Sequence, residues 1–184
     1  MRRFMAMLVV LGCARHTHAD VITTFNESQW HTFVGDYSSI DFTGLADGTP
    51  ISTQYAEMGV TFTGPTFIFA SAGFIDGWAI DGPSGVHIHF NQPQSWIAIH
   101  HAGNAYFKLY SQGQLIGTSD FDPIGGFGSF LGTSSGVAFD EVIITKPPLF
   151  CTHIAVDNLY WGVPAPGALG LLGIAGLSSR RRRT

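Results

Sequence analysis

The sequence predicts an all-β fold, an antiparallel β-sandwich of jelly-roll type. Short runs of β-branched and aromatic residues recur along the chain, and turn pairs such as Asp47-Gly48 and Asp81-Gly82 separate them. The body shows no convincing helical periodicity. With 184 residues, including 23 Gly and 15 Phe, the chain can form one such domain with an aromatic core. Only 12% of residues are charged and 45% are hydrophobic, which excludes intrinsic disorder.

The expected strands follow one another through the body, and each is bounded by turn signals. They cover residues 21–25, 39–43, 60–63, 66–69, 86–90, 96–100, 106–110, 137–144 and 153–161. Residues 29–35 are the best candidate for a short helix, with Asn26 or Ser28 as its N-cap. The polar segment 91–95 is short enough to turn the chain between two neighbouring strands. No repeat or linker divides residues 20–162, which we expect to form a single domain.

The first 19 residues are typical of a secretory signal peptide. A basic start is followed by an apolar run over residues 4–14, and Ala19 is a small residue suited to cleavage before Asp20. The run is shorter than the roughly 20 apolar residues that span a bilayer. Two alternatives remain open, a buried N-terminal helix and a lipoprotein signal with lipid on Cys13.

The last 22 residues, 163–184, form a tail in three parts: a Pro-containing break, an apolar run over residues 167–177 and a block of four Arg. The residues that define it are Val163, Pro164, Pro166, Arg180, Arg181, Arg182 and Arg183. An apolar segment closed by a cationic block inserts in a membrane with its basic end in the cytoplasm, which leaves the body on the far side. A plain tail anchor and a disordered basic tail are the alternatives.

This tail resembles the PEP-CTERM sorting signal, a C-terminal tag of bacterial proteins associated with exopolysaccharide. In that family a Pro-Glu-Pro signature precedes an apolar helix and an Arg cluster, and here Ala165 stands in place of the Glu. The resemblance implies recognition by an exosortase and transient anchoring of the C-terminal helix in the inner membrane. It also implies a mature protein in the cell envelope, at the outer surface or in the extracellular matrix of a diderm bacterium.

Residues 41–64, 130–145 and 153–162 resemble the β-sandwich ectodomain common among PEP-CTERM proteins, which is similar to carbohydrate-binding jelly rolls. Such domains often bind calcium between their first and last strands, and calcium takes six to eight oxygen ligands. On that pattern the metal ligands would be Asp41, Asp47 and Asp157, with Thr49 and Asn158 nearby. The alternative is that these acids are turn and strand-end residues. We expect no other cofactor.

Two pairs of acids are candidates for glycoside hydrolysis, which uses two carboxylates. Asp120 and Asp122 lie in a polar turn, and Asp140 and Glu141 are neighbours on a predicted strand, where side chains alternate between faces. Neither pair carries a catalytic signature, and no triad motif, metalloprotease helix or nucleotide loop is present. We therefore expect no catalytic residues.

Histidines gather in two neighbouring predicted strands. His87 and His89 share one face, and a turn at 91–95 would bring His100 close to them, where three imidazoles suit Zn²⁺ or Cu²⁺. The alternative is the solvent-exposed face of a hairpin.

Aromatic residues beside turns are candidates for stacking on sugar rings, with burial in the core as the alternative. They are Trp78, Trp96, Tyr106 and Tyr110.

The negative charge of the body excludes one class of function. Between Asp20 and Val163 the cations are Lys108 and Lys146, against all 13 acidic residues, so this stretch carries −11. Such a body repels phosphate backbones, which excludes nucleic-acid binding. We expect an exported, non-catalytic surface or exopolysaccharide-matrix protein that binds polysaccharide or another surface partner. The alternatives are a secreted glycan-active hydrolase and a purely structural surface protein.

Overall fold

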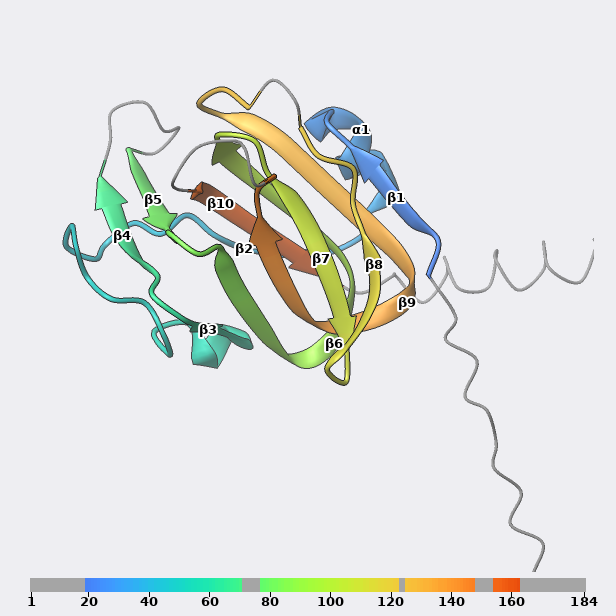
Figure 1. Ribbon diagram of the computed structural model, residues 1–184, viewed down its shortest axis with the longest axis horizontal. Coiled ribbons are helices and arrows are strands. Elements are labelled where there is room, and N and C mark those ends of the chain that lie inside the picture. Colours follow the sequence, from blue (N-terminus) through green and yellow to red (C-terminus); the bar gives the residue numbers. More distant parts are fainter. Residues whose placement is uncertain (1–18, 71–76, 123–124, 148–153, 163–184) are drawn as a thin grey trace, which may run out of the picture.

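The computed structural model describes residues 19–70, 77–122, 125–147 and 154–162, and it confirms the all-β prediction (Figure 1). The strands are β1 (Val21–Thr24), β2 (Ser38–Ile40), β3 (Val60–Thr63), β4 (Phe67–Ala70), β5 (Trp78–Asp81), β6 (Val86–Ala102), β7 (Tyr106–Ser111), β8 (Gln114–Thr118), β9 (Ser129–Thr145) and β10 (Ala155–Gly162). The helices are α1 (Glu27–Phe33) and the short 3-10 helix η1 (Ala56–Met58). The predicted signal peptide, apart from Ala19, and the predicted tail lie outside the described residues. No described helix combines the length and apolar character needed to cross a membrane.

All strand pairs are antiparallel, and two long strands connect the layers. The sheet runs in the order β4-β5-β10-β6-β9-β7-β8, with β1 beside β9, β2 beside β10 and β3 beside β6. The 17-residue strands β6 and β9 both curve at the bottom of the view in Figure 1. The first half of β6 pairs with β3 and the second half of β9, and its second half pairs with β10 and the first half of β9. One continuous sheet thus supplies both layers of the sandwich.

The corner of β6 lies at Gln94, where the register with β9 shifts on both sides. Before this corner the buried core residues are at even positions, such as Ile88, and after it they are at odd positions, such as Ile97. A bulge inserts an extra residue and bends a strand, so it also changes which side chains face inward. The bulge lets one strand keep an apolar inner face while passing from one layer to the other.

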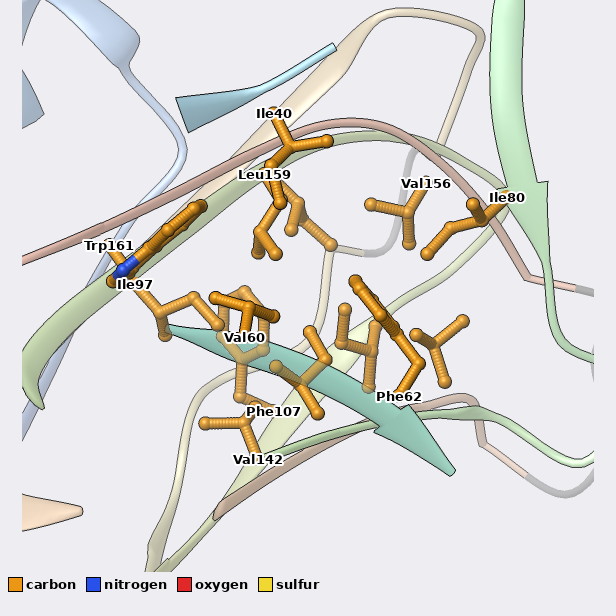
Figure 2. Packing of buried hydrophobic residues seen from close by; sticks show 14 of the residues in the cluster. Ile40, Val60, Phe62, Ile80, Ile97, Phe107, Val142, Val156, Leu159 and Trp161 are labelled. Carbon is orange, nitrogen blue, oxygen red and sulfur yellow. The ribbon is translucent and has the colours of Figure 1, made fainter. Parts of the chain in front are cut away.

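The main core fills the space between the two layers. Figure 2 shows side chains from both layers meeting there, with Phe107 and Val142 opposite Ile97 and Leu159. Phe107, Val142, Ile97 and Leu159 are each fully buried. Burying such side chains contributes about 1.5–3 kcal/mol each relative to exposure. This apolar packing holds the layers together.

A second cluster lies on the outer face of the layer that contains β10, where α1 covers the sheet. Trp30 of α1 is 2% exposed and packs with Trp96, Ala98 and Phe130. The helix begins where the side chain of Asn26 accepts a hydrogen bond from the backbone of Gln29 at 2.9 Å, as expected for an N-cap. The predicted helix and one of its two candidate caps are therefore confirmed.

One expectation about topology is wrong. The segment 91–95 does not turn the chain into a hairpin, because β6 continues through it as one bent strand. The polar run resembles a turn in sequence, yet Gln94 pairs with Phe139 of β9 at the corner. The prediction also missed β5 and β8 and the first half of β9.

Candidate functional site

Two adjacent cavities flank β2 and share Met58 as a lining residue. We call them together the β2 groove. The first cavity has a volume of about 300 Å³ and is lined by Asp36, Tyr37, Ser38, Met58, Asn91, Gln92, Gln94, Trp161 and Gly162. The second has a volume of about 210 Å³ and is lined by Ser39, Ile40, Asp41, Tyr55, Met58, Asn158 and Tyr160. The groove therefore combines segments far apart in the sequence: the 36–41 segment with β2, η1, the corner of β6, and β10.

The first cavity offers hydrogen-bonding side chains around an exposed aromatic ring. Asp36, Asn91 and Gln92 are exposed, and Tyr37 is 45% exposed. Gln94 is buried and donates from Nε2 to the backbone oxygen of Gln92 at 2.7 Å, which fixes the chain at the corner of β6. A few convergent polar groups beside apolar surface are the usual features of a small-molecule site.

The second cavity contains a buried phenol. The Tyr55 hydroxyl is buried and has no hydrogen-bond partner among the described residues. Burial raises the pKa of Tyr55, and the nearby Asp41 carboxylate raises this pKa further. The phenol therefore stays protonated.

The second cluster, which we call the α1 cluster (Trp30, Trp96, Ala98 and Phe130), packs against the aromatic walls of the groove. The ring of Tyr37 meets Trp30 and Tyr160 edge to face, with centroid distances of 5.7 Å in both cases. The Tyr160 hydroxyl lies 3.4 Å from Nδ1 of His100, whose Nε2 lies 3.3 Å from Oε2 of Glu27. These contacts position Tyr37 and Tyr160 before any ligand arrives.

The three predicted calcium ligands lie in different settings. Oδ1 of Asp41 accepts hydrogen bonds from the backbone and hydroxyl of Thr43, at 3.0 and 2.9 Å. Oδ1 of Asp47 accepts from the backbone of Ala70 at 3.0 Å, and Asp157 is fully buried in β10. Across the described ranges no group of three or more His, Cys, Asp or Glu is arranged to hold a metal ion. The calcium site stays a prediction.

The predicted meeting of three histidines does not occur, because it required the hairpin. His89 is half-buried and its Nε2 lies 3.3 Å from the Thr63 hydroxyl and 3.9 Å from a Glu141 oxygen. His100 lies beyond the corner of β6, in the α1 cluster, with 6% of its side chain exposed. The corner of the strand thus separates the two histidine groups.

The acids of each predicted catalytic pair have different surroundings. Asp120 is exposed, whereas Asp122 is buried with Oδ2 at 3.6 Å from Nε2 of His101. Both carboxylate oxygens of Asp140 accept from the backbone of Gln112 at 3.1 Å, while Glu141 lies beside His89.

The predicted stacking residues are also differently placed. Trp96 is 6% exposed under α1, and Trp78, Tyr106 and Tyr110 are half-buried. Tyr37 is the exposed aromatic ring that lines the groove, and it is not among the predicted stacking residues. The consecutive amides Asn91 and Gln92 are the sequence signal that could have marked this site, but they were interpreted as a turn.

Comparison with known proteins gives two distant likenesses. No family model and no curated protein matches the chain. The catalytic domain of Agl-KA is similar over 70% of this chain and 28% of its own, with 12% identity and a TM-score of 0.37. The isomalto-dextranase of Arthrobacter globiformis T6, solved with panose, is similar over 79% of this chain and 35% of its own, with 14% identity and a TM-score of 0.34. At this level of similarity, neither protein's activity nor its substrate can be assigned to this chain.

Proposed function

We propose that this chain is an exported, non-catalytic surface or exopolysaccharide-matrix protein that binds polysaccharide through the β2 groove. The observation that carries the proposal is the combination of the exposed Tyr37 ring with exposed carboxylate and amide side chains in one cavity. Sugars present hydroxyl groups around an apolar ring face. Amides and carboxylates hydrogen-bond the hydroxyls, and an aromatic ring packs on the apolar face.

The form of the groove favours a chain-like ligand over a single sugar. The two cavities lie one after the other along the segment from Asp36 to Asp41, and neither encloses its contents. Five extended residue steps span at most about 16 Å. A polysaccharide can lie along this length without its ends being buried, so the site needs no free chain terminus.

Binding of the purified full chain to a glycan array tests the proposal. We expect retention of at least one polysaccharide, and Tyr37→Ala should weaken it about tenfold or more, since stacking and ring burial are lost. Phe33→Ala is the matched control, because Phe33 is a 66% exposed aromatic residue on α1 that does not line the groove. Absence of glycan binding would contradict the binding proposal, and release of reducing ends from a bound glycan would contradict its non-catalytic part.

Export and sorting are proposed from the two chain ends. Removal of residues 163–184 should release the body from the membrane fraction into the medium, because the apolar run and the Arg block are lost. Replacing Arg180–Arg183 with Ala is the matched control for the charge block alone. If the shortened protein stays with the membrane to the same extent, the tail does not anchor it.

A further inference from the structure

We propose that the β2 groove selects polysaccharides that carry free amino groups, as in de-N-acetylated hexosamine polymers, and rejects polysaccharides that carry carboxylates. This inference rests on the proposed glycan-binding function of the groove. It adds the charge class of the ligand, which the hydrogen-bonding side chains alone do not specify.

The groove has a carboxylate in each of its two cavities. Asp36 lines the first cavity and is exposed, and no described residue hydrogen-bonds or ion-pairs with its carboxylate. Asp41 lines the second, and its Oδ1 serves the turn at Thr43 while no described residue bonds its Oδ2. Both cavities therefore have an acceptor oxygen with a negative charge available to a ligand.

No Lys or Arg among the described residues lines this groove. The two lysines of the body are Lys108 on β7, in the other layer, and Lys146, just after β9. His31 contacts Tyr37 from the α1 side at 5.3 Å between ring centroids, and its Nε2 lies 3.6 Å from Oε1 of Glu27, so a carboxylate lies directly beside this imidazole. With −11 over residues 20–163, the surrounding field adds to that of the two carboxylates.

Charge and hydrogen bonding then favour the same ligand. An ammonium group donates hydrogen bonds and has no acceptor, so it pairs with a carboxylate and gains from the negative field. An acetylated amine is neutral and gains only the hydrogen bonds. A uronic acid brings a carboxylate towards Asp36 and Asp41, and like charges that lose water repel each other strongly.

Binding of the full chain to three oligosaccharides tests the inference: glucosamine oligomers, N-acetylglucosamine oligomers of the same length, and oligogalacturonate. We expect the glucosamine oligomers to bind about tenfold more tightly than the acetylated ones in low salt, and oligogalacturonate not to bind. The preference should shrink as salt is added, because partly exposed charges are screened beyond about 10 Å at 0.1 M ionic strength.

Isosteric variants test whether the preference for oligomers with free amino groups depends on Asp36 and Asp41. Asp36→Asn and Asp41→Asn should each weaken binding of the glucosamine oligomers about fivefold. They should weaken binding of the acetylated oligomers less, because the amide of Asn can still hydrogen-bond a sugar hydroxyl but cannot pair with an ammonium group. Asn at position 41 keeps an acceptor for Thr43, so the turn is preserved. Asp120→Asn is the matched control. Asp120 is exposed just after β8, so this substitution removes one negative charge at a site away from the groove.

The outcomes separate this inference from the proposed function. Equal binding of the amino and acetylated oligomers, or tightest binding of oligogalacturonate, would overturn the inference and leave a glycan-binding groove. An equal loss in Asp36→Asn and Asp120→Asn would also overturn it, because the effect would then come from net charge alone. If none of these ligands binds, and no glycan on the array binds either, the proposed function fails first.

Discussion

The layer that contains β10 is buried on its inner face and, where α1 covers it, on its outer face, and the two faces differ in chemistry. Its inner face packs into the main core with aliphatic residues such as Ile97, Ile99 and Leu131. Its outer face, under α1, carries aromatic rings and His100, whose Nε2 lies 3.3 Å from Oε2 of Glu27 on α1. The inner face holds the fold together, whereas the outer face shapes the groove wall. Substitutions on the two faces should therefore have separable effects.

The largest effect is expected from the inner face. Leu131→Ala should destabilise the whole domain by about 2–5 kcal/mol, because Leu131 is fully buried and its truncation leaves a cavity between the layers. Urea unfolding followed by tryptophan fluorescence and circular dichroism measures this, and both probes should shift together. Leu115→Ala, at a 45% exposed position, is the control. Equal losses in the two variants would contradict the assignment of the core.

A substitution on the outer face should loosen α1 without disturbing the main core. A Cβ added at Gly132 would lie 2.4 Å from Cδ1 of Trp30, so Gly132→Ala should push α1 off the sheet at a cost of about 1–3 kcal/mol. Hydrogen exchange should increase in α1 before the main core changes. Gly136→Ala on the same strand is the control, because a Cβ there meets only Asp20 O at 4.0 Å. Equal exchange in the two variants would mean that Trp30 does not rest on Gly132.

Neighbouring histidines allow the faces to be compared by pH. Burial lowers the pKa of His101, with a further lowering from His100, and the Gly103 carbonyl and Asp122 oppose this. The folded state thus prefers neutral His101. Its contribution to stability is full above the unfolded value of about 6.5 and is lost as pH falls towards the folded value.

The expected slope in that window is at most about 1.4 kcal/mol per pH unit. His101→Gln should flatten it, whereas His100→Gln should reduce it only in part, because burial, the largest cause of the lowered pKa of His101, remains. Urea melts across the acidic range measure the slope, and an unchanged slope in His101→Gln would assign the acid sensitivity to another group.

The smallest effect concerns the start of α1. Asn26→Ala should cost about 1 kcal/mol, because the hydrogen bond to the backbone of Gln29 is lost. Asn26→Ser keeps an acceptor and should restore most of the stability. Glycan binding should weaken together with the loss of helix order, since α1 supports Tyr37. Full binding with a frayed helix would show that the groove wall does not depend on α1.

Local pattern made part of this fold predictable. The expected strand at 60–63 matches β3, and the expected cap at Asn26 matches α1, because alternation and capping depend only on nearby residues. The corner at Gln94 was not predictable, since a polar run has the same composition in a turn and in a bulge. The β2 groove was not predictable either, because Asp36, Asn91 and Asn158 meet only through long-range strand pairing.

The position of β10 determines when this chain can fold. β10 is the last strand in sequence, yet it pairs with β2, β5 and β6 and so lies inside the sheet. Its partner Ile40 precedes Leu159 by more than a hundred residues, and such distant pairings make folding slow. Until β10 has been synthesised, β2 lacks its strand partner and β5 and β6 present unpaired edges, which attract other chains. Emerging chains therefore need protection until almost all of the body is available, and loss of the last strand alone would prevent the domain from closing.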